Sequence, residues 1–325
     1  MNIDMHNHYV PYSYIKELKE GASNLEARLV TQDNNDFVQQ NNGAFYPAYR
    51  RFYDIEGKVE EMYQKKIDMS ILSVAPPLFS YWTSEEISLY IAQMVNDELF
   101  TIVRKYPDYF LAMATVPLNN VEQAILELER SVNKLGIKAV EIGTTVNGEL
   151  ISSPKFHPFF KKAEELDVFV FVHPYLEKKE AKDEYYLSNF IYNPFETART
   201  MANFIFNGFI ERFPKIKICF AHGGGFLPYQ IGRLNHGYET RPRARKDADL
   251  YPSEAISKFY FDSLIFDYKS LDFLVKLIGA DNIMMGSDSP FGMSDSSPVT
   301  TINQLLLSER EKEKIKGDNV LKKIC

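Results

Sequence analysis

The chain has 325 residues, of which 45% are hydrophobic and 25% charged, so it can bury a large core as one large domain or two small ones. The formal net charge of −7 argues against nucleic acid as a partner, since the basic residues are dispersed apart from one small cluster: Arg241, Arg243, Arg245 and Lys246. We expect a cytoplasmic protein without a membrane segment, because no leader peptide or long apolar run is visible. The chain has two cysteines, Cys219 and Cys325, and we expect no disulfide between them.

Strand-like apolar runs alternate with helix-like segments along the chain, a pattern typical of a parallel sheet covered by helices. The eight runs are residues 2–5, 69–74, 110–115, 138–142, 168–172, 216–221, 259–261 and 283–285. Capping signals predict one helix that starts after Thr83 and another that starts after Asn120 and stops at Gly136. Eight such units predict an α/β fold, a (β/α)8 TIM barrel, formed by residues 1–325 as a single domain. An open doubly wound sheet is the alternative.

One segment, from about residue 9 to residue 54, does not fit this repeat. It is rich in Asn, Gln, Tyr and Gly, and it contains two turn-forming stretches, residues 32–36 and 39–43. Several aromatic residues give it enough apolar side chains to pack, which argues against a disordered excursion. A long insertion in a compact domain is usually functional, so we expect a lid over the mouth of the barrel.

Five side chains suited to metal binding or proton transfer follow the predicted strands. His6 and His8 are two residues apart, so in a strand both project to one face, although a pair of surface histidines has the same spacing. His173, His222 and Asp288 follow later runs. In a barrel the C-terminal ends of all strands meet at one face, where we expect these side chains to converge. Two further histidines lie outside this pattern and are interpreted as structural or surface residues, His157 and His236.

These residues lie in motifs that resemble one known family. The chain reads IDMHNH at residues 3–8 with Pro11 following, FSYW at 79–82, EIGTTVN at 141–147, FVHP at 171–174, CFAHGGG at 219–225 and GSDSPF at 286–291. Together and in this order, over nearly the whole chain, they resemble the amidohydrolase-2 family of the amidohydrolase superfamily. Within it they are most similar to the decarboxylases of the aminocarboxymuconate-semialdehyde type.

The resemblance implies a (β/α)8 barrel with one divalent metal ion per chain, zinc in the first place and manganese as the alternative. The metal ligands would be His6, His8, His173 and Asp288. Three imidazoles and a carboxylate leave room for a water molecule, whose pKa a zinc ion lowers towards about 7. His222 is then implied in proton transfer, with Asp288 as the second catalytic group.

The resemblance also implies which residues bind the substrate, together with one departure from the family pattern. The family has an arginine for a substrate carboxylate in the inserted segment, and that position falls on Tyr46 here, with Arg50 and Arg51 close by as possible replacements. Tyrosine cannot make the bidentate charged contact that arginine makes. A second family arginine, which reaches across a dimer interface, matches Arg241, and Trp82 of the FSYW motif completes the predicted set.

Three classes of function remain open from the sequence. The first is a metal-dependent, nonoxidative decarboxylase (carboxy-lyase) that acts on a small unsaturated or aromatic carboxylic acid and works as a homodimer. The second is a metal-dependent hydrolase of a lactone or amide, with the carboxylate as base; release of carbon dioxide separates the two. The third is a noncatalytic binding protein. The presence of a proton-transferring histidine beside the metal ligands argues against this class.

Overall fold

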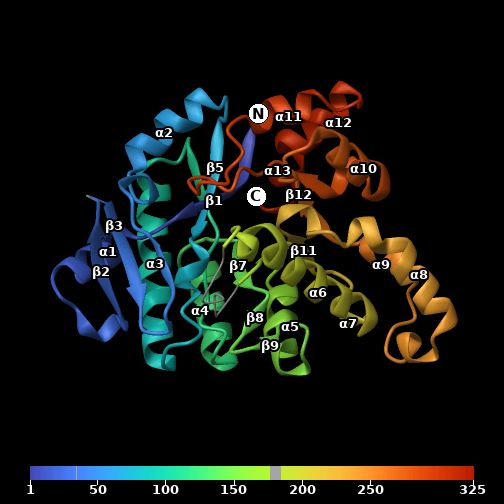
Figure 1. Cartoon of the computed structure of the whole chain (residues 1–325), viewed down its shortest axis with the longest axis horizontal. Coiled ribbons are helices and arrows are strands. Elements are labelled where there is room, and N and C mark those ends of the chain that lie inside the picture. Colours follow the sequence, from blue (N-terminus) through green and yellow to red (C-terminus); the bar gives the residue numbers. More distant parts are fainter. Residues whose placement is uncertain (34, 176–183) are drawn as a thin grey trace.

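The computed structural model describes residues 1–33, 35–175 and 184–325, and in these ranges eight parallel strands form a closed barrel. The strands are β1 (Ile3–Tyr9), β5 (Met69–Val74), β6 (Phe110–Ala112), β7 (Ala139–Gly143), β10 (Phe169–His173), β11 (Lys217–Phe220), β12 (Tyr260–Asp262) and β13 (Ile283–Met284). They pair in the orders β1-β5-β6 and β7-β10-β11-β12-β13, and Figure 1 shows helices on the outside of these strands. Single parallel bridges close the two remaining gaps, Ala114 with Val140 and Asn7 with Ser289. The predicted barrel is therefore confirmed, and the open sheet is rejected.

Each predicted apolar run overlaps one barrel strand, and the run 69–74 coincides with β5. Of the two predicted helix starts, the one at Asn120 is confirmed, because its side chain accepts a hydrogen bond from the backbone N–H of Gln123. The other is wrong by one residue. Ser84 rather than Thr83 caps the helix, because Ser84 Oγ accepts from the N–H of Ile87, whereas the hydroxyl of Thr83 donates to the backbone.

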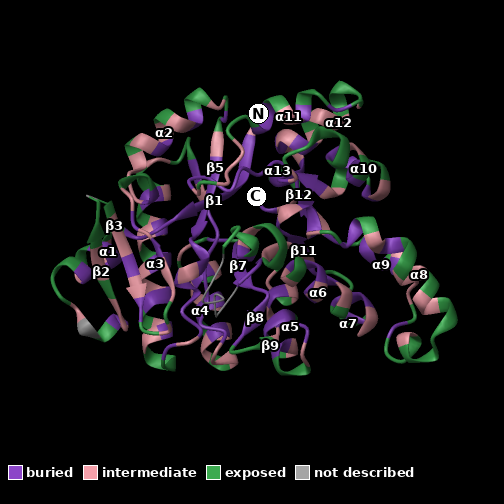
Figure 2. Ribbon diagram, in the orientation of Figure 1, coloured by how far each residue is buried: buried purple, intermediate pink, exposed green. Residues whose placement is uncertain are grey.

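Helices surround the barrel, and their outer faces are exposed (Figure 2). They are α1 (Tyr12–Lys19), α2 (Ile55–Gln64), α3 (Glu85–Lys105), α4 (Val121–Asn133), α5 (His157–Glu165), α6 (Asn193–Phe206), α7 (Phe209–Arg212), α8 (Ile231–Thr240), α9 (Pro252–Ile256), α10 (Tyr268–Ile278), α11 (Pro298–Asn303), α12 (Glu309–Glu313) and α13 (Asn319–Lys323). No helix within the described ranges is both long and apolar enough to cross a membrane.

The inside of the barrel is packed with apolar side chains towards the N-terminal ends of its strands. This cluster includes Ile3, Met5, Phe169 and Phe171, together with Val320 and Ile324 from the C-terminal end of the chain. The apolar packing and the C-terminal segment thus fill one end of the barrel. The C-terminal ends of the strands are left for polar side chains, as is usual in this fold.

The segment between β1 and α2 leaves the barrel and forms a small antiparallel sheet of its own. Its strands are β2 (Ala27–Gln32), β3 (Asn35–Gln40) and β4 (Phe45–Pro47), paired in the order β2-β3-β4. Val38 and Tyr46 are buried side chains of this sheet. A second, shorter excursion follows β7 as a hairpin, β8 (Thr145–Val146) with β9 (Glu149–Leu150).

Candidate metal centre and active site

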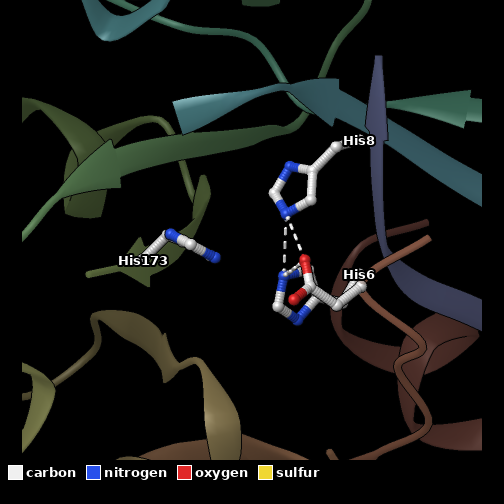
Figure 3. A group of neighbouring side chains, drawn as sticks. His6, His8 and His173 are labelled. Carbon is white, nitrogen blue, oxygen red and sulfur yellow. Dashed lines mark hydrogen bonds and ion pairs between the residues drawn. The ribbon is translucent and has the colours of Figure 1, made fainter. Parts of the chain in front are cut away.

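Four buried side chains meet at the C-terminal end of the barrel. His6 and His8 come from β1, His173 ends β10, and Asp288 follows β13; one ligand atom of each lies within 4.8 Å of the others. The Nε2 atoms of His6 and His8 are 2.9 Å apart, and Asp288 Oδ1 is 3.0 Å from His8 Nε2. Figure 3 shows a ring nitrogen of His8 directed at His6, with His173 beside them. The structure therefore brings together the four side chains predicted as ligands.

The other ring nitrogen of each histidine is held by an acceptor. The contacts of the Nδ1 atoms are His6 to Asp262 Oδ2 at 2.7 Å, His8 to the carbonyl of Val74 at 3.1 Å and His173 to the carbonyl of Pro174 at 2.9 Å. A neutral ring that donates from Nδ1 keeps a lone pair on Nε2, which is the arrangement of metal-binding histidines.

The ring nitrogens that face the centre of the cluster show whether a cation fits the site. His173 Nε2 is buried and has no hydrogen-bond partner among the described residues. Three imidazole lone pairs and a carboxylate that face one point repel one another, and a divalent cation between them removes that repulsion. The set of three nitrogens and one oxygen therefore fits a divalent metal ion.

Burial and neighbouring charges shift the pKa values in the same region. Burial, reinforced by the neighbouring histidines, holds the pKa of His173 well below its usual range, which keeps the ring neutral. Burial alone would raise the pKa of Asp288, but its contacts with His222 and His8 outweigh burial and lower it well below the usual range. Glu141 at β7 is fully buried, and burial raises its pKa to about 7. The centre thus places the neutral ring of His173 beside the ionised carboxylate of Asp288.

His222 lies beside this cluster on the turn that follows β11. Its Nε2 is 3.6 Å from Asp288 Oδ2, and its Nδ1 has no hydrogen-bond partner in the described part of the chain. Both His222 (φ 54°) and Asp288 (φ 60°) have left-handed backbone conformations, which cost about 1–3 kcal/mol each for residues other than glycine. Such strain persists only where the surroundings impose it, and it is common at functional sites.

Asp262 connects the metal ligands with the turn of His222. Besides the contact with His6, its Oδ1 accepts a hydrogen bond from the N–H of Gly223 at 2.8 Å. The sequence analysis did not identify Asp262 as a site residue. The signal was present, because Asp262 directly follows the predicted strand 259–261 and so obeys the rule that identified the histidines.

Two adjoining cavities open over the cluster, and both are lined by His222 and Asp288. One has a volume of about 230 Å³, and its lining includes residues of the inserted segment and several aromatic rings: Gln40, Asn42, Phe45, Tyr46, Tyr175 and Phe291. The other has a volume of about 260 Å³ and a largely apolar lining that includes Phe190, Leu264, Ile265 and Phe266. A small planar molecule in either cavity would lie against His222 and Asp288.

The residues predicted to bind substrate are distributed unevenly. Tyr46 lines the first cavity, and burial raises the pKa of its hydroxyl well above the usual range, so the group is neutral. Trp82 is half-buried, and Arg51 and Arg241 are exposed; none of the three is among the residues that line the two cavities. Arg241 follows the last residue of α8.

The two histidines interpreted as structural or surface residues lie away from the cluster. His157 is the first residue of α5 and is 3.2 Å from Arg212 Nη1, whereas His236 is exposed on α8.

Solved structures of decarboxylases share this architecture. A 5-carboxyvanillate decarboxylase from Sphingomonas paucimobilis matches with a TM-score of 0.83 at 23% identity, covering 99% of this chain and 98% of that protein. A dihydroxybenzoic acid decarboxylase from Polaromonas sp. JS666, with bound manganese and the inhibitor 2-nitroresorcinol, matches with a TM-score of 0.78 at 22% identity, covering 99% and 96%. At these identities, the likeness establishes the fold.

Sequence comparison assigns the family. The chain is 32% identical to 2-amino-3-carboxymuconate-6-semialdehyde decarboxylase of Dictyostelium discoideum over 99% of its own length and 90% of that protein. The amidohydrolase family matches residues 3–322, so the match covers the barrel, the inserted segment and every residue of the candidate site. The chain belongs to the amidohydrolase family.

Proposed function

We propose that this protein is a metal-dependent, nonoxidative decarboxylase that acts on a small unsaturated or aromatic carboxylic acid. The observation that carries the proposal is the buried cluster of three histidines and one carboxylate, with His222 beside it, at the base of a cavity lined by aromatic rings. Relatives that act as decarboxylases support the reaction type.

The reaction needs a group that binds the carboxylate and a group that delivers a proton. The bond between the carboxylate carbon and the unsaturated carbon breaks, carbon dioxide leaves, and the carbon that keeps the electron pair takes up a proton. A divalent cation held by His6, His8, His173 and Asp288 supplies Lewis acidity at this point. His222 delivers the proton, since its ring lines both cavities and contacts Asp288.

The experiment that tests this proposal combines metal analysis with a substrate panel. The purified protein is expected to hold about one zinc or manganese ion per chain. It is then assayed for carbon dioxide release from 2-amino-3-carboxymuconate semialdehyde, 5-carboxyvanillate and 2,6-dihydroxybenzoate, with lactones and amides in parallel. Hydrolysis without carbon dioxide release would assign the protein to the hydrolases of the superfamily, and the absence of stoichiometric metal would refute both assignments.

We assign the inserted segment the role of a lid that belongs to the same domain as the barrel. Gln40 and Phe45 line the first cavity, and Gln40 Nε2 donates a hydrogen bond to the carbonyl of Pro77 at 2.8 Å, which ties the segment to the loop after β5. A lid of this kind excludes water from the reacting carbon. Protection of residues 27–47 from hydrogen exchange on addition of the inhibitor 2-nitroresorcinol would support the role; unchanged exchange at saturation would reject it.

We propose a homodimer as the working unit, with Arg241 reaching the neighbouring site. Several aromatic side chains beside the second cavity and α8 are at least 43% exposed, among them Phe190, Phe195, Phe226 and Tyr229. Exposed apolar patches of this kind mark interaction surfaces. Sedimentation of the active protein as a monomer would refute the dimer.

The role of Arg241 is tested by mixing two inactive variants, Arg241→Ala and His222→Asn. Once subunits exchange, a heterodimer contains one site with both changes and one site with neither, so activity is expected to return in part. Demonstrated exchange without recovery would leave Arg241 as a surface residue.

A further inference from the structure

The barrel closes between β1 and the segment after β13, and this seam carries three of the four proposed ligands. His6 and His8 are on one side of it and Asp288 on the other. Backbone hydrogen bonds cross the seam from Met5 N–H to Met285 O at 2.9 Å, from Asp288 N–H to His6 O at 2.8 Å and from His8 N–H to Ser289 O at 2.7 Å. Any slip along the seam would therefore move His6 and His8 relative to Asp288.

A fully buried carboxylate, Asp4, spans this seam. Its Oδ1 accepts from the N–H of Ser287 at 2.9 Å and from the N–H of His6 at 3.2 Å. Its Oδ2 accepts from the hydroxyl of Ser287 at 2.6 Å and from Asn7 Nδ2 at 3.1 Å. Ser287 directly precedes Asp288, so one carboxylate holds the chain beside the ligands on both sides of the seam.

A buried lysine from α2 holds the same seam from outside the barrel. Lys58 is 3% exposed, and its Nζ donates to Asn7 Oδ1 at 2.9 Å and to the carbonyl of His8 at 2.8 Å. On the next turn of α2, Glu61 accepts a hydrogen bond from the hydroxyl of Ser289 at 2.6 Å. Helix α2 thus contacts β1 through Lys58 and the segment after β13 through Glu61.

Buried charges of this kind are a costly way to hold two strands together. Desolvation of each ion costs several kcal/mol, and well-packed apolar side chains often stabilise a fold as well or better. Hydrogen-bonded charges do fix direction and register more narrowly than apolar contacts. That precision matters at this seam, because Asp288 has a left-handed backbone and must face two imidazoles from the opposite strand.

We infer that Asp4 and Lys58 are positioning residues, whose buried network sets the register of the β1–β13 seam and thereby the metal affinity of the site. The inference rests on the proposed metal site, and it assigns a role to side chains that contact neither the cavities nor the proposed metal position. Partners of ligands that hold their orientation typically contribute 10- to 100-fold to metal affinity.

The experiment compares how firmly variants of the metal-loaded protein retain their metal against a chelator. Asp4→Asn keeps the shape of the side chain but replaces an acceptor with a donor, and Lys58→Met removes the ammonium while keeping the stem. The matched control is Glu127→Gln in α4, where the side chain is 2% exposed and accepts from Asn96 Nδ2 of α3 at 2.6 Å. Thermal stability is measured for each, so that a general loss of stability is separated from a loss of metal.

Asp4→Asn and Lys58→Met are expected to lose half their metal at chelator concentrations about 10- to 100-fold lower than the wild type. Glu127→Gln is expected to lose stability without that change. Equal retention by all variants would overturn the inference and leave the proposed function intact, whereas a wild type that holds no metal would refute the proposed function itself. Should Asp4→Asn fail to fold, Ser287→Ala tests the same contact, because it removes the hydroxyl that donates to Asp4, together with the acceptor of the Ser289 N–H.

Discussion

The rim of the barrel and the walls of the cavity above it are built in different ways. The rim carries His6, His8 and His173 on strands, where backbone pairing and buried partners hold each ring. The walls come from the inserted sheet and from segments after the strands, where Tyr186 and Phe190 are half exposed. From this difference we expect a division of labour in which the strand ends hold the metal and the segments above them contact the substrate.

The largest expected effect comes from removing a ligand at the rim. His173→Ala should reduce the metal content from about one ion per chain to a small fraction and abolish turnover, because the remaining three groups no longer enclose the cation. Metal analysis after gel filtration checks this, with exposed His236→Ala as the control. Full metal retention in both His173→Ala and a His6→Ala, His8→Ala double variant would contradict the site.

A smaller effect is expected at His222, which we place beside the metal and not on it. His222→Asn should keep the metal and lower turnover by about 10²- to 10⁴-fold, the usual contribution of an acid or base group. Carbon dioxide release per metal-loaded site is the measurement. Loss of the metal would show that His222 is a ligand, and unchanged turnover would remove it from the mechanism.

Asp262 connects the rim to the turn of His222. Changing it should have a smaller effect than His222→Asn and a larger one than the loss of a single hydroxyl from the walls. Asp262→Asn weakens the contact that holds His6, so metal affinity is expected to fall by about 10- to 100-fold. Asp267→Asn is the matched control, because Asp267 caps α10 through the N–H of Ser270 and asparagine caps a helix about as well as aspartate, so this change should leave both stability and metal affinity nearly unchanged. Similar metal affinity in the two variants would reduce Asp262 to a structural role.

The same division explains what the sequence could and could not predict. Period and composition predicted all eight strands, and the rule that catalytic groups follow strands brought His173 and Asp288 to the same place as His6 and His8. Asp262 obeyed that rule but was overlooked, since a carboxylate after a strand is less distinctive than a histidine.

The walls depend on contacts between distant segments, which local pattern does not specify. The alternation in β2 to β4 gives no indication that Gln40 is tied to Pro77, and only the family resemblance, not the local pattern, predicted Tyr46 near the substrate. Nor does the sequence indicate that Lys58, in an otherwise ordinary amphipathic helix, is buried against β1. Long charged side chains are expected to be exposed, and this one is buried only because the seam supplies two acceptors.

The smallest expected effect tests the walls through a single hydroxyl. Tyr46→Phe keeps the ring in place and removes only the neutral hydroxyl, which lies 3.5 Å from Gln40 Nε2 and is hydrogen-bonded to Tyr14. One neutral hydrogen bond is worth about 0.5–1.5 kcal/mol, so KM should rise by roughly 2- to 12-fold if the hydroxyl contacts the substrate, while metal content and turnover stay near those of the wild type. Tyr14→Phe removes the neighbouring hydroxyl, which is buried but is not among the cavity-lining residues, and it should leave KM nearly unchanged. Equal changes in KM for the two variants would indicate that the effect comes from altered packing of the inserted sheet and not from a lost substrate contact. A loss of metal in Tyr46→Phe would contradict the division between rim and walls, because a wall residue would then contribute to metal binding.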